Sequence, residues 1–243
     1  MTRADPSPRS GRTPRPVWQE TLLLVALALV LAVGVKAFLL QAFYIPSESM
    51  EPGLVEHDRI LVQKVSYWGE GEPERGDVVV FEDPGGWLDD GEVGPDNVVT
   101  RGLEVVGLYP AGGHLVKRVV GVEGDTVECC DEQGRLQVNG APVEEASYVA
   151  AGAECAGPMV GNCSWSAGPV PEGHLFVMGD NRSRSADSTV HMCRPDRTDC
   201  VEGREFVPEA NVVGRVLAIV WPTSHLSRVE RPHSFDQVPE AGP

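Results

Sequence analysis

Residues 45–54 have the sequence IPSESMEPGL, and the rest of the chain is arranged around this stretch. Two serines, Ser47 and Ser49, lie one residue apart between Pro46 and Pro52, and both prolines restrict the local backbone. Because proline is rare inside helices and central strands, we predict a rigid, irregular turn, a common setting for a reactive side chain. The sequence also allows a plain linker between an anchor and a domain.

The composition is that of a folded, acidic, mainly β protein. The chain has 243 residues, enough for one anchor and one fairly large domain, or for two small domains. Its 27 glycines and 20 prolines imply many turns, which favours β-structure with long loops over a helical bundle. The formal net charge of -16 argues against nucleic-acid binding, which needs a basic surface.

An apolar segment near the N-terminus predicts a membrane anchor. Residues 20–43 are predicted to form a single-pass transmembrane helix, about 34 Å long if it runs from Thr21 to Phe43. Lys36 near its outer end can snorkel toward the interface. A cleavable signal peptide is the alternative, since Ala32-Val33-Gly34 resembles a processing site.

The preceding residues 1–19 are rich in Pro, Ser and Arg and are predicted to be a disordered tail. Their arginines place this tail in the cytoplasm and everything after residue 43 outside the cell membrane.

Beyond the anchor, the apolar residues follow a β pattern, and residues 44–222 are predicted to form one extracytoplasmic catalytic domain. Asn139-Gly140 predicts a two-residue hairpin turn. Two segments without clear periodicity, 83–113 and 144–173, are predicted to be insertions, and residues 223–243 a frayed C-terminal tail. Strands are predicted at residues 59–65, 77–81, 115–122, 136–138, 174–178 and 212–221.

A serine nucleophile needs a base that takes its proton, and Lys117 is the best candidate. The six histidines lie in loop contexts without a triad signature. On a strand, Lys117 shares a face with the apolar Leu115 and Val119, and burial there lowers a lysine pKa. Bringing it from ~10.4 to about 7.5 costs ~4 kcal/mol, which burial can supply. The alternative is a surface lysine on a strand edge.

A third polar patch follows the strand predicted to end at Met178. Residues 179–188 have the sequence GDNRSRSADS, in which Ser185 offers a hydroxyl and Asp187 a carboxylate. Such a cluster is either a loop held by Asx turns or a loop that positions a catalytic group.

Together these patches resemble the type I signal peptidases, membrane-bound Ser/Lys proteases of bacteria and organelles. The resemblance implies a β-sandwich-like catalytic core with inserted β-rich segments behind an N-terminal anchor. The matching segments occur in the family's order: IPSESMEP at 45–52, RGDVVVF at 75–81, VKRVVG at 116–121 with Gly124-Asp125, and GDNR at 179–182 through SADS at 185–188.

The resemblance also implies roles for individual residues. Ser49 would be the nucleophile and Lys117 the general base. Ser185 would orient the lysine amine, and Asp187 would support the site. Ser47, with the backbone N–H of Ser49, would form the oxyanion hole.

Further implications concern the loop and the substrate. Asp180 and Arg182 would hold the loop together. A cleft with shallow pockets would select small residues at positions −1 and −3 of a preprotein signal peptide. No cofactor or metal is implied, and the expected partners are signal peptides and the lipid bilayer. The residues that resemble the family's pocket lining are Phe43, Ile45, Met50, Leu54 and Val116.

The sequence departs from the family pattern at two positions. Gly53 stands where relatives often have Thr. Thr189 stands where many relatives place Arg, which removes a possible ion-pair partner of Asp187.

All six cysteines lie on the predicted outer side, where disulfides persist. Cys193 with Cys200 is the first expected pair, and Cys155 with Cys163 the second. A bond between the adjacent Cys129 and Cys130 would be strained, so the alternative is that each pairs elsewhere, which would displace that second pair. A zinc site is the rival interpretation, but no Cys-x2-4-Cys spacing is present.

The function predicted from these observations is removal of signal peptides from exported proteins by a membrane-anchored endopeptidase. Two alternatives remain: a non-catalytic, membrane-tethered β-domain that binds partners, and a Ser/Lys protease that cleaves itself. A binding domain has no chemical reason to keep both Ser49 and Lys117. The long anchor and the lack of a DNA-binding segment argue against self-processing of the repressor type.

Overall fold

A computed structural model describes residues 16–67, 69, 71–88, 113–150, 164–193 and 200–242. Most of the first predicted insertion (89–112), the middle of the second (151–163) and most of the N-terminal tail lie outside these described residues. The Cys155–Cys163 pair lies outside them as well.

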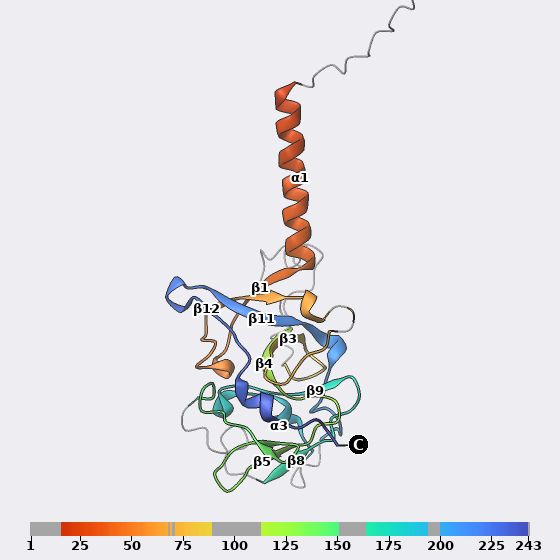
Figure 1. Ribbon diagram of the computed structural model, residues 1–243, viewed down its shortest axis with the longest axis vertical. Coiled ribbons are helices and arrows are strands. Elements are labelled where there is room, and N and C mark those ends of the chain that lie inside the picture. Colours follow the sequence, from red (N-terminus) through yellow and green to blue (C-terminus); the bar gives the residue numbers. More distant parts are fainter. Residues whose placement is uncertain are drawn as a thin grey trace, which may run out of the picture.

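The N-terminal helix α1 (Val17–Phe38) projects from one end of the β domain (Figure 1). Its leucines between Leu22 and Leu31 are 58–66% exposed. The predicted helix over 20–43 was wrong at its end, because β1 (Leu40–Tyr44) pairs antiparallel with the next strand and its backbone is taken up by that ladder. Within the described parts of the chain, no helix has the combined length and apolarity needed to cross a membrane.

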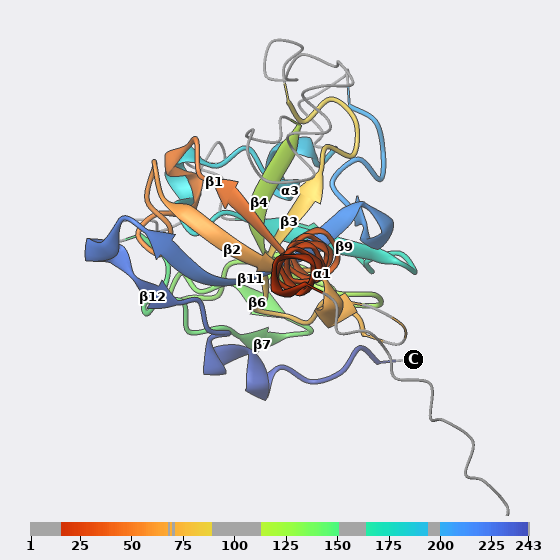
Figure 2. The same cartoon turned by 90° about the horizontal axis from the view of Figure 1, so that it is seen from above.

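The domain is mainly β, as predicted, and its larger sheet has eight strands joined in antiparallel pairs. The order is β1-β2-β11-β3-β4-β9-β10, and β12 also pairs with β11. Figure 2 shows these strands fanned out beneath α1. Their bounds are β2 Arg59–Gln63, β3 Val78–Glu82, β4 His114–Gly121, β9 His174–Met178, β10 Val207–Pro208, β11 Val212–Trp221 and β12 Ser227–Arg228.

A smaller four-stranded sheet lies at the end of the domain away from α1 (Figure 1), in the order β7-β6-β5-β8. The predicted hairpin is confirmed: Asn139 and Gly140 have φ angles of 53° and 75° and join β6 to β7. β8 lies in the second predicted insertion and was missed, because three residues are too few to show periodicity. The strands are β5 Val127–Cys129, β6 Gln137–Val138, β7 Ala141–Pro142 and β8 Trp165–Ala167.

Short helical turns lie between these strands and after the last of them. They are η1 Glu48–Met50, η2 Val65–Tyr67, η3 Arg182–Arg184, α3 Ser188–His191, η4 Glu209–Asn211, η5 Thr223–His225 and η6 His233–Gln237.

The core lies on both faces of the larger sheet. Strand alternation sends Val78 and Val80 into a cluster with β1 and β2 side chains, and Val79 and Phe81 into a second cluster on the other face. A third cluster fills the space under the smaller sheet. β3 and β4 are therefore buried on both faces, which makes them a rigid base for the polar residues that they carry.

The predicted frayed C-terminal tail was wrong. Phe235 and Val238 are only 4% and 8% exposed and join the third core cluster. The ring of Phe235 lies 6.2 Å from that of Tyr148. Two isolated apolar residues in a polar segment carry no periodic signal, so only tertiary packing shows that this segment is part of the domain.

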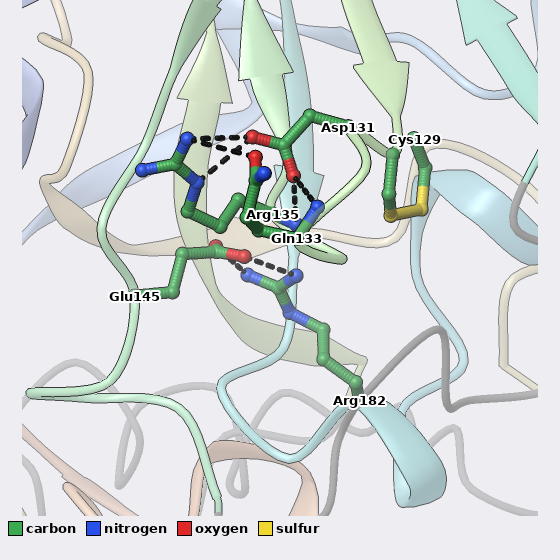
Figure 3. Close-up of a disulfide and its surroundings, with 7 residues drawn as sticks. Cys129, Asp131, Gln133, Arg135, Glu145 and Arg182 are labelled. Carbon is green, nitrogen blue, oxygen red and sulfur yellow. Dashed lines mark hydrogen bonds and ion pairs between the residues drawn. A yellow bond between two sulfur atoms is a disulfide. The ribbon is translucent and has the colours of Figure 1, made fainter.

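Of the predicted disulfides, Cys193–Cys200 is confirmed. The alternative that Cys129 and Cys130 each pair elsewhere was wrong, because the two adjacent cysteines are bonded to each other (Figure 3).

Candidate active site

The segment around Ser49 is a single turn of 3-10 helix, η1, which agrees with the irregular turn predicted for this stretch. Ser47 precedes this turn with extended backbone angles, and its Oγ donates to Ser49 Oγ over 3.3 Å. Met50, 1% exposed, anchors the turn in the core cluster below it. Ser49 itself is 7% exposed, so its hydroxyl lies at the floor of the site.

Lys117 lies on the central strand β4, opposite Val79 of β3. Its side chain is 4% exposed, which excludes the alternative of a surface lysine. The amine Nζ donates to Ser49 Oγ over 2.9 Å and to the carbonyl of Val116 over 3.1 Å. The structure thus brings together the two residues expected to form the catalytic pair, 68 positions apart in sequence.

Burial lowers the pKa of Lys117 to about 8, because an ammonium loses its hydration in this position. The negative charges of Asp187 and Asp180 act in the opposite direction on this pKa, with a smaller effect. Near neutral pH a useful fraction of the amine is therefore unprotonated and can accept a proton from Ser49.

The loop after β9 packs against the backbone of the nucleophile, Ser49. The N–H of Gly179 donates to Asp187 Oδ2 over 2.9 Å, and its carbonyl accepts from Arg182 Nε over 2.9 Å. A Cβ at position 179 would lie 2.5 Å from the carbonyl oxygen of Ser49 and 2.3 Å from Ser185 Oγ, so only glycine fits there. The N–H of Asn181 donates to the same Ser49 carbonyl over 3.0 Å.

Asp187 is 2% exposed and caps the short helix α3. Besides the Gly179 N–H, it accepts from the Thr189 N–H over 3.1 Å and the Thr189 hydroxyl over 2.6 Å, both at Oδ1. The departure from the family pattern at Thr189 therefore does not leave this carboxylate without support.

Ser185, predicted to orient the lysine amine, is 1% exposed. Ser185 lies close to the backbone of Ser49. Within the described residues its Oγ has no hydrogen-bond partner, so it makes no hydrogen bond to Lys117. Its role stays a prediction.

Two buried ion pairs hold the polar loop against the domain. Arg118 contacts both carboxylate oxygens of Asp180, over 2.8 and 2.6 Å, and donates to the carbonyl of Gly76 over 2.8 Å. Arg182 forms an ion pair with Glu145 (Figure 3). These contacts agree with the expectation that Asp180 and Arg182 hold the loop together.

The partners of this loop were partly missed in the sequence. Glu145 lies in a segment predicted to be an inserted loop, where no pattern marked it. Tyr148, whose ring centroid lies 4.5 Å from the Arg118 guanidinium carbon, lies in the same segment. A second basic residue directly after Lys117 on a buried strand was the available signal for Arg118, because a buried guanidinium needs a carboxylate partner.

The residues predicted to line the substrate pockets lie in one core cluster next to Ser49. Val116 is half-buried and packs against this cluster. Whether these residues contact substrate stays a prediction. The other four are 1–7% exposed: Phe43, Ile45, Met50 and Leu54.

Among the described residues, no group of three or more His, Cys, Asp or Glu side chains is placed to hold a metal ion. A buried serine hydroxyl bonded to a buried lysine amine is instead the arrangement of a Ser/Lys hydrolase.

Comparison with known proteins agrees with this class. Residues 18–221 match the signal peptidase family, peptidase S26. The chain is 40% identical over 229 residues to a signal peptidase I of Mycobacterium tuberculosis, covering 87% of this chain and 76% of that protein. It is 31% identical over 232 residues to a signal peptidase I of Leptolyngbya laminosa, covering 96% and 93%.

Among solved structures, a signal peptidase I from Enterococcus faecalis is 25% identical and covers 59% of this chain and 96% of its own. Its TM-score of 0.31 is too low to add an argument. The sequence matches are sufficient: this chain belongs to the signal peptidase family S26, which confirms the resemblance drawn from its four motifs.

Proposed function

We propose that this protein is a membrane-attached serine endopeptidase that removes N-terminal signal peptides from exported preproteins, with Ser49 as nucleophile and Lys117 as general base. The observation that carries the proposal is the 2.9 Å hydrogen bond between the two buried side chains. Membership in the signal peptidase family supports the substrate class.

In the proposed reaction, unprotonated Lys117 takes the proton of Ser49 as its oxygen attacks the carbonyl carbon of the scissile bond. The resulting ammonium then donates this proton to the leaving amine, and the mature protein is released. The signal peptide remains bound to Ser49 as an ester. Water attacks the ester with Lys117 again as base, and the signal peptide departs with a free carboxylate.

The oxyanion of the tetrahedral intermediate needs fixed donors. We assign these to the backbone N–H of Ser49 and the hydroxyl of Ser47. Two observations support this assignment: Ser47 is exposed, and its Oγ lies 3.3 Å from Ser49 Oγ.

The proposed preference for small residues at positions −1 and −3 rests on the apolar cluster beside Ser49. This cluster is already filled by its own side chains, which favours shallow pockets that accept Ala and exclude Phe or Leu. The substrate would bind extended and pair with a strand edge through its backbone.

Membrane attachment is proposed through α1, whose leucines are exposed around the helix and would be covered by lipid. The arginines of residues 1–19 favour a cytoplasmic N-terminus, with the catalytic domain on the outer side.

The deciding experiment incubates the detergent-solubilised protein with a preprotein and locates the cut by mass spectrometry. Cleavage directly after the signal peptide supports the proposal, and Ser49→Ala should abolish it. Ser224→Ala, which removes the hydroxyl of an exposed serine, serves as the matched control. A folded wild-type protein that binds the preprotein without cutting it would leave the non-catalytic binding domain as the function.

A further inference from the structure

Thr189 has no role in the reaction described above, yet its hydroxyl makes the shortest of the hydrogen bonds to Asp187. We propose that Thr189 is a positioning residue of the catalytic site: its hydroxyl fixes the Asp187 carboxylate, which in turn fixes Gly179 against the nucleophile. This inference rests on the proposed function, since the reaction that it tunes is the proposed one.

The first link is the contact between the hydroxyl and the carboxylate. Thr189 Oγ1 donates to Asp187 Oδ1 over 2.6 Å, and both residues are almost fully buried, at 3% and 2% exposure. A hydrogen bond to a charged acceptor away from water is among the stronger kinds in proteins. Water cannot replace the hydroxyl at such a site without opening the loop.

The second link is the contact between Asp187 and the nucleophile segment. The other carboxylate oxygen of Asp187 accepts from the Gly179 N–H over 2.9 Å. At Gly179 the loop approaches the Ser49 carbonyl so closely that no side chain fits between them. A shift of Asp187 would therefore move the backbone against which Ser49 rests, and small displacements of a nucleophile are costly in rate.

The third observation concerns the charges around the pair. Arg118 is bound to Asp180, and Arg182 to Glu145 and the Gly179 carbonyl. Within the described residues no lysine or arginine forms an ion pair with Asp187, so neutral donors alone hold it: two backbone N–H groups and the Thr189 hydroxyl. Among the described residues this hydroxyl is the single side-chain donor to Asp187, and the arginines Arg118 and Arg182 are already paired with other carboxylates.

The test compares Thr189→Val, which keeps the shape and the backbone N–H but loses the hydroxyl, with Thr189→Ser, which keeps the hydroxyl. For preprotein cleavage, Thr189→Val is expected to lower kcat about tenfold with KM unchanged, because a charge-assisted hydrogen bond that holds the site is lost. Thr189→Ser should remain within about threefold of wild type. Thr223→Val, at an exposed position, controls for the loss of a threonine hydroxyl elsewhere.

Two outcomes would overturn the inference: an unchanged kcat in Thr189→Val, or a serine variant as slow as the valine variant, which would make the methyl group responsible. If Thr189→Val does not fold, Thr189→Ala against Thr189→Ser gives the same comparison. A wild-type protein that does not cleave the preprotein refutes the proposed function instead, so the two failures are distinguishable.

A double-mutant cycle checks that Thr189 acts through Asp187. In an Asp187→Ala background, assayed with enzyme in excess over substrate, Thr189→Val should have no further effect on the rate. A full, independent loss from each substitution would contradict the proposed order of contacts.

Discussion

Lys117 and Arg118 are neighbours on β4 and are equally buried, at 4% exposure each, but their surroundings differ in kind. Arg118 faces a carboxylate that it contacts at both oxygens. Among the described residues, Lys117 donates hydrogen bonds to a hydroxyl and a carbonyl oxygen. A buried cation with a matched anion keeps its charge, whereas one with neutral partners gives up its proton readily. The same strand thus carries a structural cation and a reactive amine side by side.

The strongest test of this difference is Lys117→Met, which keeps an unbranched side chain and removes the amine. Cleavage of a preprotein should fall by at least about 10³-fold, because the base is lost. The free energy of unfolding should stay equal or rise, since a poorly solvated ammonium is replaced by an apolar group. Rate assays and urea unfolding of the same preparation test both. Normal turnover in a folded Lys117→Met protein would refute the Ser/Lys pair.

The opposite result is expected one residue further along, for Arg118→Met. This substitution leaves Asp180 buried without its partner and should destabilise the domain by about 3–5 kcal/mol in urea unfolding. Arg135→Met is the matched control: its ion pairs with Asp131 and Glu144 are partly exposed, and we expect a much smaller loss of stability. Equal losses of unfolding free energy in the two variants would show that the buried Arg118–Asp180 pair contributes no more to stability than an exposed pair.

Lys117 and Arg118 also show how much of the site can be predicted from the sequence. The strand pattern correctly placed Lys117 and Arg118 on a buried strand, and the family motifs pointed to Ser49 as its partner. The fold class, the strands at 174–178 and 212–221 and the hairpin at Asn139 were predictable because each has a local signal: a period of two or a turn dipeptide.

What the sequence did not predict depends on contacts between distant segments. Glu145 and Tyr148 contact the catalytic loop from a stretch with no pattern of its own. Phe235 is a single ring in a polar tail, and its burial depends on a partner 87 positions away, Tyr148. The end of α1 was also misjudged, because the apolar Leu40–Tyr44 suits a helix as well as an edge strand, and only pairing with β2 decides between them.

The serine whose hydroxyl donates to the nucleophile, Ser47, gives a further prediction. Ser47→Ala should lower kcat by roughly 10²–10³ with little change in KM, because its hydroxyl is proposed to stabilise the oxyanion and not to bind the ground state. Steady-state kinetics on a preprotein measure both constants. An increase in KM alone, or no effect, would make Ser47 a residue that only precedes the η1 turn.

The smallest expected effect is the pH dependence, which tests Lys117 without any mutation at the site. Since the pKa of Lys117 is lowered to about 8, its amine gains base activity as pH rises through this value. Cleavage should therefore increase about tenfold between pH 7 and pH 9, as the unprotonated fraction rises from about one tenth to about nine tenths.

The lowered pKa of Lys117 also makes the stability of the fold depend on pH. The direction of this dependence follows from the number of protons bound by the folded and unfolded states. An unfolded chain keeps the ordinary lysine pKa, so between about pH 8 and about pH 10 the unfolded state binds more protons than the folded state, and the contribution of Lys117 to stability rises with pH. Below that window both states are protonated, and the folded state bears the full cost of the buried ammonium. Lys117→Met should lack this rise. Urea unfolding of the wild type and Lys117→Met across this pH range measures the difference, and parallel curves would show that Lys117 titrates normally in the folded protein.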